Sequence, residues 1–249
     1  MKVKVLVHGA GGKMGAEVIR CISKMNEVEL LGGVDAMGKG EQDYPYYKTF
    51  DQVVDTPDIL VDFSFHTLVP SVLDYAEKVG CGVVIATTGL TEEELQRVKD
   101  ASKKIPVFYS ANMSVGIALL VDFAKKAAAA FPCADIEIVE AHHTRKVDAP
   151  SGTALMIANG IREVRPYATY ALGRQGEGKR TPEEIGIHAL RMANIVGEHV
   201  VYVTTDTQQL CLKHTAYDRA LFAEGALKAA TFLVGRANGL YNMYDLLYD

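Results

Sequence analysis

Apolar and polar positions divide the first part of the chain into short apolar runs separated by longer amphipathic segments. The apolar runs are rich in Val and Ile, and they predict buried parallel strands at residues 3–7, 29–34, 59–63, 82–86 and 106–109. The amphipathic segments predict helices at residues 16–25 and 68–79, and a third helix that begins after Thr91. Because strands and helices alternate, we expect this part to be α/β, with a doubly wound parallel sheet.

The pattern changes after residue 112, where a long helical segment replaces the alternation. The elements expected there are a helix at 115–131, a strand at 136–139, a helix at 154–164 and strands at 185–190, 198–204 and 208–214. This pattern predicts a smaller α+β domain with a mixed, mostly antiparallel sheet. An alanine-rich helix at 217–234 and the tail are expected to return to the first domain. The predicted domains are therefore 1–112 together with 217–249, and 113–216.

Composition and charge argue against several kinds of partner. The 249 residues carry a net charge of −5 with mixed signs and no basic block, so neither nucleic acid nor an anionic membrane surface is expected to bind. No apolar stretch approaches the roughly 18 residues of a membrane helix, and the first residues lead into a strand without a signal-peptide pattern. The four cysteines lie far apart without a CxxC pair, which is typical of reduced cytosolic thiols. We therefore expect a cytoplasmic protein.

A glycine-rich turn follows the first predicted strand. Residues 8–15 read His-Gly-Ala-Gly-Gly-Lys-Met-Gly and precede a predicted helix. Glycines in this place let the backbone approach a pyrophosphate, which then rests on the helix N-terminus. An acidic residue ends the second strand, about 20 residues beyond the turn, where a carboxylate can bind the adenosine ribose hydroxyls. The combination predicts a Rossmann-like dinucleotide-binding domain, with cofactor contacts at Gly9, Gly12, Lys13, Met14, Gly15 and Asp35.

Further candidates lie where the later strands of the predicted sheet end. Ligands of doubly wound sheets bind at the carboxyl ends of the strands. His66 lies at this rim but has no obvious partner in the sequence, so we interpret it as structural. We assign to the cofactor site the residues at the ends of the third and fourth strands, which are Phe63, Ser64, Thr87, Thr88 and Gly89.

The densest polar cluster in the chain is the stretch from Glu140 to Ala154. It holds two adjacent histidines, two basic residues, two carboxylates, a proline and a Ser-Gly-Thr turn, and it connects a predicted strand to a predicted helix. Pro150 suits the first turn of that helix. The N–H groups and hydroxyls that follow would bind a carboxylate or phosphate at the helix N-terminus, where Arg145 and Lys146 add positive charge. The histidines can supply protons near neutral pH.

This stretch allows other interpretations. It could be a solvated loop with a helix cap, because Ser and Thr often begin helices. A metal site is disfavoured because adjacent histidines seldom converge on one ion and no Cys or HxxxH partner is present, so we expect no metal. If the strand continues to His143, neighbouring side chains point to opposite faces. Only one of His142 and His143 would then share a pocket with Glu140.

The stretch closely resembles the signature of the dihydrodipicolinate reductase family. That signature reads E-A-H-H-x-x-K-x-D-x-P-S-G-T-A, and every fixed letter is present at residues 140–154. Similar motifs extend over nearly the whole chain, at residues 9–15, 86–89, 110–116, 195–199 and 239–241. With the motif at 110–116, the expected cofactor site also includes Ser110, Asn112 and Met113.

The resemblance implies NAD(P)H-dependent reduction of 4-hydroxy-tetrahydrodipicolinate to tetrahydrodipicolinate in the diaminopimelate and lysine pathway. It implies that His142 donates a proton with Lys146 beside it, and that Arg145 and Asp148 are structural. Family members are usually homotetramers whose substrate-domain sheets meet, and a small open sheet also requires a partner. We therefore expect residues 113–216 to be the substrate-binding and oligomerisation domain. The carboxylates of the small cyclic dicarboxylate would be bound by His143, Lys146, Ser151, Gly152 and Thr153.

The sequence departs from the family pattern at two places. Ala36 follows Asp35, where several relatives carry Arg. Asp35 would repel the 2′-phosphate of NADPH and Ala36 offers no compensating charge, so we predict that NADH is preferred and NADPH is accepted. Lys13 is the basic group expected to reach a 2′-phosphate. Met192 and Ala193 replace the usual Gly-Gly before the Ile-Val-Gly-Glu-His element, which affects the local loop geometry.

Two other functions stay open. One is another two-domain NAD(P)-dependent dehydrogenase of aspartate-family metabolism, such as an aspartate or homoserine dehydrogenase. The complete string from His142 to Thr153 argues against it. The other is a non-catalytic regulator that binds NAD(H). Such a regulator has no need for His142 and Lys146 beside an anion-binding helix end.

Overall fold

A computed structural model of the chain describes residues 2–38 and 42–249. The chain divides into two compact units, one formed by residues up to Val115 together with Arg219–Asp249, and the other by Gly116–Asp218. The predicted domain boundaries lie within a few residues of these limits. Among the described residues, no helix combines the length and apolar character that a bilayer crossing requires.

The first unit is built on a seven-stranded sheet in which every pairing is parallel, as expected for a doubly wound fold. The order of strands is β12-β6-β5-β4-β1-β2-β3. Two short edge strands were not predicted, because two or three residues are too few to show a period. The strands are β1 (Val3–His8), β2 (Val28–Val34), β3 (Tyr46–Tyr47), β4 (Ile59–Asp62), β5 (Gly82–Ile85), β6 (Pro106–Tyr109) and β12 (Gly239–Tyr241).

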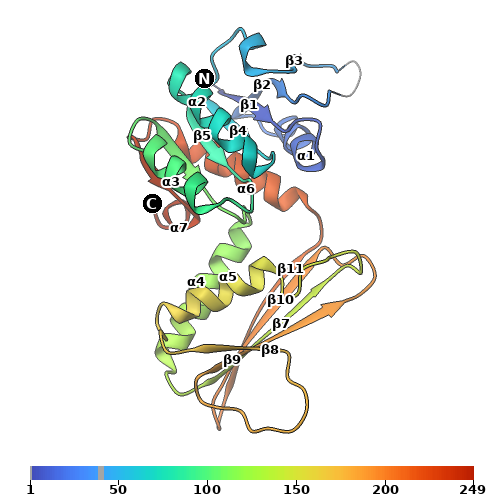
Figure 1. Ribbon diagram of the computed structural model, residues 1–249, viewed down its shortest axis with the longest axis vertical. Coiled ribbons are helices and arrows are strands. Elements are labelled where there is room, and N and C mark those ends of the chain that lie inside the picture. The colour runs from blue at the N-terminus through green and yellow to red at the C-terminus, as the bar shows by residue number, and fades with distance from the viewer. Residues whose placement is uncertain (1, 39–41) are drawn as a thin grey trace. The chain divides into compact units, whose positions relative to one another are not determined.

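Helices cover both faces of this sheet (Figure 1). α1 (Lys13–Ile22) packs with α6 (Ala220–Leu233), and α2 (Val69–Val79) packs with α3 (Glu92–Ala101). α3 begins with the predicted capping box, in which Thr91 and Glu94 bond each other's backbone N–H groups. α1 starts three residues before the predicted position, directly inside the glycine turn. The remaining short helices are η1 (Phe50–Gln52), η2 (His66–Leu68) and α7 (Met243–Tyr248).

The second unit contains a five-stranded mixed sheet with the order β11-β10-β7-β9-β8. The expected mixed sheet is confirmed, but the expectation that it is mostly antiparallel was wrong. β10 pairs antiparallel with β7 and β11, whereas β9 pairs parallel with β7 and β8. The parallel half was missed because β8 is a short edge strand with partly exposed residues. The strands are β7 (Asp135–His142), β8 (Thr169–Leu172), β9 (Glu184–Arg191), β10 (Gly197–Thr204) and β11 (Gln209–Ala216).

Two helices, α4 (Val115–Ala130) and α5 (Gly152–Arg162), cover one face of this sheet (Figure 1). Their apolar residues pack with Ile136 and Ile138 of β7 in a buried core. Because side chains alternate along a strand, Glu140 and His142 extend from β7 on this same face. The sheet therefore places two polar side chains at the helix-covered end of an otherwise apolar row.

Candidate active site

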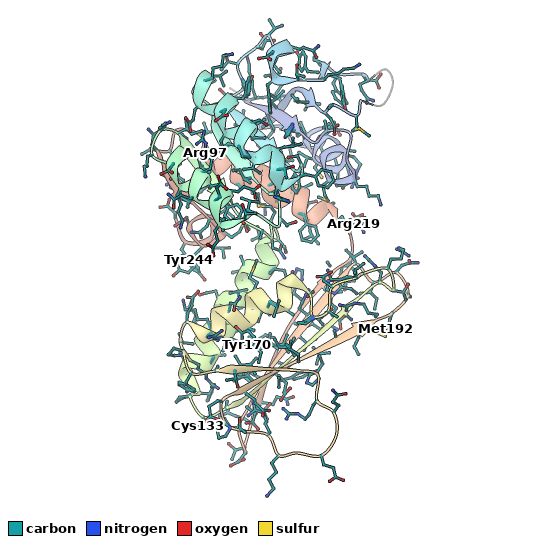
Figure 2. All side chains as sticks on the ribbon, viewed as in Figure 1. Arg97, Cys133, Tyr170, Met192, Arg219 and Tyr244 are labelled. Atoms are coloured by element: carbon teal, nitrogen blue, oxygen red, sulfur yellow. The ribbon has the colours of Figure 1, made fainter. Side chains whose placement is uncertain are left out.

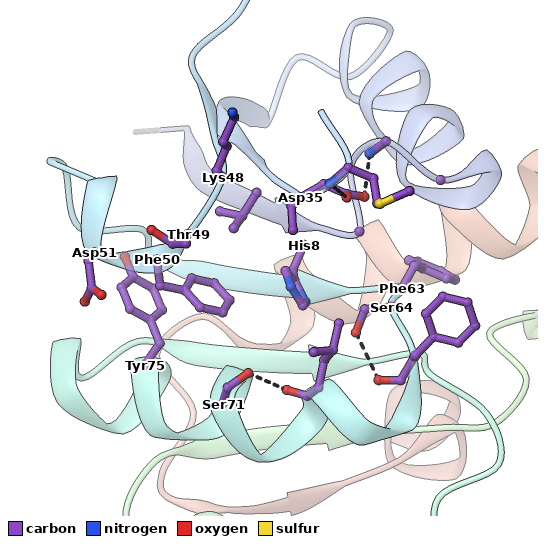
Figure 3. A pocket seen from close by; sticks show the side chains of 18 of the residues that line it. His8, Asp35, Lys48, Thr49, Phe50, Asp51, Phe63, Ser64, Ser71 and Tyr75 are labelled. Carbon is purple, nitrogen blue, oxygen red and sulfur yellow. Dashed lines mark hydrogen bonds between the residues drawn. The ribbon is translucent and has the colours of Figure 1, made fainter. Parts of the chain in front are cut away.

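A cavity of about 860 Å³ lies at the carboxyl ends of β1, β2 and β4 in the first unit. Figure 3 shows side chains from separate elements around it, including His8 from β1 and Tyr75 from α2. Phe50 stacks on Tyr75 with ring centroids 4.5 Å apart and forms an aromatic wall. The predicted cofactor residues that line the cavity are Gly9, Gly12, Asp35, Phe63 and Ser64.

The glycine turn leaves no room for side chains. Gly9 has a φ of 76°, and a Cβ there would lie 2.7 Å from the carbonyl oxygen of Phe63. A Cβ on Gly15 would lie 2.1 Å from the carbonyl oxygen of Gly9. Gly12 caps the N-terminus of α1 in an extended conformation. The turn thus fits a dinucleotide, since a pyrophosphate needs close backbone approach and a helix N-terminus.

Asp35 lies at one end of the cavity with its carboxylate fixed by the backbone. Its oxygens accept hydrogen bonds from Gly11 N at 3.0 Å and Met37 N at 2.8 Å. Ala36 lines the cavity beside it. An anchored carboxylate of this kind suits the ribose hydroxyls of an adenosine.

Two lysines are candidates for the cation near Asp35. Lys13 is exposed and is not among the residues that line the cavity, whereas Lys48 is. A bond from Asp35 N to Tyr47 O, 3.0 Å long, makes Lys48 the neighbour of Asp35 across the β2–β3 pair. Figure 3 shows Lys48 and Asp35 on the same side of the cavity, across from Ser71 and Tyr75. Lys48 could not be predicted from the sequence, because β3 is only two residues long.

A buried polar chain fixes the rim of the sheet. His8 Nδ1 lies 2.7 Å from Asp62 Oδ1, and Thr87 Oγ1 donates to Asp62 Oδ2 at 2.6 Å. Ser64 N donates in turn to Thr87 Oγ1 at 3.1 Å. Thr87 is therefore a buried link between β5 and Ser64. His66, for which the sequence offered no partner, pairs with Glu94 at 2.9 Å.

The other predicted cofactor residues lie away from the cavity wall. The segment after β6 forms a compact turn in which Ser110 Oγ donates to Asn112 O, and Asn112 Oδ1 accepts from Ser114 N. Met113 is buried, and Met14 is half-buried in α1. The predicted residues not among those that line the described cavity are Lys13, Met14, Gly15, Thr87, Thr88, Gly89, Ser110, Asn112 and Met113.

The second group of predicted residues surrounds His142 at the end of β7 in the second unit. The His142 ring is 8% exposed, and its Nδ1 lies 2.5 Å from Glu140 Oε2. Its other nitrogen faces Gly197, where a Cβ would come within 3.2 Å of Nε2. The ring of His199 packs edge-on against it with centroids 5.2 Å apart.

Glu140 is fully buried, and both of its oxygens are bonded. Arg191 donates Nη1 to Oε2 and Nη2 to Oε1, each at 2.8 Å, and Ser151 N donates to Oε1 at 3.0 Å. Burial would raise the pKa of Glu140, but His142, Arg191 and the Ser151 amide lower it to about 2. The sequence predictions missed Glu140 and Arg191 as site residues. Only the spacing of Glu140 and His142, two apart on one strand, signalled their contact.

His199 is neutral in this cluster. Burial and the neighbouring His142 lower the pKa of His199 to about 3. Its Nε2 shares a hydrogen bond with Ser151 Oγ at 3.1 Å, and the same oxygen accepts from Ala154 N at the start of α5. Ser151 is thus the N-cap, and Pro150 precedes the helix instead of lying in its first turn. His199 was not predicted, although it belongs to the motif at 195–199.

Lys146 is paired with a neighbouring carboxylate. Its Nζ lies 2.8 Å from Asp148 Oδ1. Burial opposes the ionisation of Asp148, but Lys146 and the backbone N–H groups of Asp148 and Gly152 hold the pKa of this carboxyl below its usual range. The carboxylate thus lies beside the first residue of α5, where the sequence predicted an anion. Gly152 is exposed, and Thr153 and His143 are half-buried.

The β9–β10 connection closes over the end of β7. Met192, labelled in Figure 2, donates its N–H to His142 O at 2.8 Å, and Thr144 N donates to Ala193 O at 3.2 Å. Ala193 has a φ of 42°, a left-handed conformation that favours the glycine of the family pattern. Arg145 bonds Asn194, as expected for a structural residue. Met192 and Ala193, which replace the usual Gly-Gly, thus hold the end of β7 through their backbone groups.

Comparison with known proteins places both units in one family. The descriptions "Dihydrodipicolinate reductase, N-terminus" and "Dihydrodipicolinate reductase, C-terminus" match residues 3–113 and 116–247. The chain is 46% identical to the 4-hydroxy-tetrahydrodipicolinate reductase of Caldanaerobacter subterraneus subsp. tengcongensis over 99% of both chains. It is 41% identical to that of Clostridium tetani, over 99% of this chain and 98% of the relative.

A solved structure agrees with this result. Dipicolinate-bound dihydrodipicolinate reductase from Paenisporosarcina sp. TG-14 superimposes with a TM-score of 0.83 at 27% identity, over 97% of this chain and 98% of that chain. These matches cover nearly all of both units and nearly the whole length of each related chain. This chain belongs to the dihydrodipicolinate reductase family and is an NAD(P)H-dependent oxidoreductase.

Proposed function

We propose that this protein reduces 4-hydroxy-tetrahydrodipicolinate to tetrahydrodipicolinate with NAD(P)H, in the diaminopimelate and lysine pathway. One observation carries the proposal. A dinucleotide turn occurs in the same chain as a histidine held by a buried carboxylate, with Lys146 and a helix N-terminus a few residues further on. This combination provides a nucleotide site, a proton donor and an anion-binding site.

The chemistry follows from these groups. After loss of water the substrate ring contains a conjugated C=C–C=N unit, and bound NAD(P)H supplies a hydride to it. Negative charge then develops toward the ring nitrogen. His142 donates a proton from Nε2, and the ammonium of Lys146 stabilises the developing charge. His142 afterwards regains its proton from solvent.

Lys146 can bind a substrate carboxylate beside its internal partner. Its ammonium has three N–H donors, and in the described part of the chain it forms one ion pair, with Asp148. We assign carboxylate binding to His143, Lys146, Gly152 and Thr153. The amide of Ser151 donates to Glu140 and its hydroxyl accepts from Ala154 N and bonds His199 Nε2, so Ser151 is engaged mainly within the protein.

The cofactor proposal is that NADH is preferred and NADPH is accepted. Asp35 favours free ribose hydroxyls and repels a 2′-phosphate, and Ala36 adds no positive charge. Lys48 replaces Lys13 in this proposal as the cation that admits NADPH, because it lines the cavity. Its exposed charge is screened at physiological salt, where the Debye length is about 8 Å. The values of kcat/KM for NADH and NADPH should therefore approach each other as the salt concentration is lowered.

The assembly and location are also proposed. A homotetramer would cover the face of the second-unit sheet opposite α4 and α5. Sedimentation velocity measures its mass directly, and a monomer at micromolar concentration would contradict it. A cytoplasmic location agrees with the four cysteines, all of which are free thiols.

A coupled assay tests the function. The preceding synthase generates the substrate in place, and oxidation of NADH or NADPH is followed by absorbance. We expect turnover, with pyridine-2,6-dicarboxylate inhibiting more strongly than picolinate, because it presents two carboxylates. Equal inhibition would contradict a two-carboxylate site. Turnover of aspartate or homoserine instead would identify a different dehydrogenase, and NADH binding without any turnover would indicate a regulator.

A further inference from the structure

Glu140 has contacts that a simple structural ion pair does not need. It is fully buried, it bonds the Nδ1 of the proposed proton donor, and its remaining lone pairs are filled by Arg191 and the Ser151 amide. It cannot touch substrate directly, since no part of it is exposed. Any effect of Glu140 on the reaction must therefore pass through the groups that it bonds, of which His142 is the proposed proton donor.

The bond to Glu140 decides which nitrogen of His142 exchanges protons. A carboxylate only accepts hydrogen bonds, so Nδ1 carries a proton in both the neutral and the charged ring. Proton exchange is left to Nε2, which faces the space kept open by Gly197. The neighbouring His199 does not compete for this proton, because its buried ring remains neutral.

Arg191 supplies a charge that does not change during turnover. When His142 gives up its proton, a buried carboxylate paired with His142 alone would lose its counter-charge, which is energetically costly. The guanidinium of Arg191 bonds both oxygens of Glu140 and stays charged throughout. Its Nη2 also donates to the carbonyl of Asp148, in the loop that carries Lys146. One side chain thus links the proton donor to the anion-binding loop.

We propose that Glu140 and Arg191 are a positioning pair that fixes the tautomer and direction of His142 and keeps its surroundings charge-balanced as it donates a proton. This inference rests on the proposed function and deepens it. Neither residue is proposed to contact substrate or cofactor. The pair acts as the buried carboxylate does in hydrolytic triads, with an added fixed cation.

The same strand supplies a matched control. Glu137 of β7 lies three residues away on the opposite face and also binds a histidine and arginines. Its Oε2 lies 2.8 Å from His188 Nε2, and its Oε1 lies 3.3 Å from both Arg174 and Arg180. The side chain of Glu137 is 28% exposed, whereas that of Glu140 is fully buried, so the free energy of unfolding of both variants is measured beside kcat.

The first experiment compares Glu140→Gln with Glu137→Gln in the full-length enzyme. We expect Glu140→Gln to lower kcat about 10²-fold or more, within the ~10⁴-fold loss known for orienting carboxylates. Binding of pyridine-2,6-dicarboxylate and of NADH should be retained, and Glu137→Gln should keep normal kcat. Equal losses of kcat in the two variants would overturn the proposal, as would loss of inhibitor binding in proportion to kcat. Arg191→Lys, which keeps the charge, should restore part of the activity that Arg191→Met loses.

A double-mutant cycle tests whether Glu140 acts through His142. In the His142→Gln background, Glu140→Gln should cause no further loss of kcat, because residues that act as a unit are not additive. Independent, additive losses would contradict the pair. The absence of a further loss of kcat in the double variant would distinguish positioning of His142 from a general effect of Glu140 on stability.

A last measurement needs no substitution and no turnover. Nitrogen-15 NMR of the wild-type imidazole should show the neutral His142 ring protonated at Nδ1, and the opposite tautomer would overturn the inference. Wild-type protein without reductase activity would instead refute the proposed function alone, since the tautomer is measured independently of activity.

Discussion

The two candidate sites are built from different materials. In the first unit the nucleotide turn is shaped by backbone, because Gly9 and Gly15 leave no room for a Cβ, and the cavity beside it is lined by separate side chains, Asp35 and Lys48 among them. In the second unit the site consists of buried side chains. Glu140, His142 and His199 are each less than a tenth exposed, and they bond one another or Arg191 and Ser151.

The difference follows from what each site has to do. Binding a pyrophosphate requires N–H groups and space, which any backbone can offer if side chains are absent. Delivering a proton requires one nitrogen atom in a defined protonation state and direction, and this demands partners that stay charged and ordered. Buried, fully bonded ion pairs provide that order, but removing one partner lowers the free energy of unfolding strongly, because it leaves a buried charge unpaired. The two units should therefore respond to substitution in different ways.

The largest effect should come from removing the proton donor or its neighbouring cation. His142→Gln and Lys146→Ala should each lower kcat by roughly 10²–10⁴-fold, the usual range for a positioned acid or base. The KM for NADH should barely change, because the glycine turn belongs to the other unit. Steady-state kinetics with both substrates measures these values. A near-normal kcat in His142→Gln would show that His142 is not the proton donor.

The corresponding substitution in the first unit is Gly15→Ala, in the glycine turn. The added Cβ would lie 2.1 Å from the carbonyl of Gly9, so the backbone must shift. The shifted turn should fit the pyrophosphate less well, and a loss of about 1–3 kcal/mol of binding free energy would lower NADH affinity by roughly 5- to 150-fold. Inhibitor binding in the second unit should be retained. Gly178→Ala is the control, because a Cβ there meets nothing within 4 Å. Calorimetric titration with NADH and with pyridine-2,6-dicarboxylate measures both affinities, and a loss of inhibitor affinity in Gly15→Ala would contradict the separation of the two sites.

Acid should destabilise the second unit through His199. The pKa of its ring falls from 6.5 to about 3 on folding, so between these values the unfolded chain binds more protons than the folded one. The free energy of unfolding therefore rises with pH in this window and is lost on acidification, by up to ~1.4 kcal/mol per pH unit. Urea unfolding from pH 6.5 to 5.5 keeps most of the titration of Glu140, whose ordinary pKa is 4.5, outside the measured window. His199→Asn should flatten the slope, and an unchanged slope would assign it to other groups.

The smallest predicted effect concerns the cations near Asp35. Lys48→Ala should lower kcat/KM for NADPH by about two- to fivefold, as for an exposed ion pair worth 0.3–1 kcal/mol, with little change for NADH. Lys13→Ala should affect both cofactors less. The ratio of the two efficiencies at low and high salt is the measurement. A selective loss of NADPH use in Lys13→Ala, with none in Lys48→Ala, would restore the sequence-based assignment.

Parts of the fold and the site could be predicted from the sequence because they depend on local spacing. The strands β1, β2, β4, β5 and β6 contain short, mainly apolar runs, and the capping box of Thr91 and Glu94 marks the start of α3. The glycine turn is a local motif for the same reason. The edge strands β3 and β8 could not be predicted, since their few residues receive their pairing from neighbours distant in sequence.

The sequence by itself therefore determined the α/β architecture, the nucleotide turn and the residue types of the reactive stretch. Each of these follows from a pattern over residues that are close together in the chain. The tertiary structure alone decided which partners those residues have. It placed Lys48 beside Asp35 through β3, and it brought Arg191 and His199 to Glu140 and His142 through the pairing of β9 and β10 with β7. Arg191 and His199 thereby bond residues 51 and 48 positions away, and a register between strands, not a local pattern, sets these contacts.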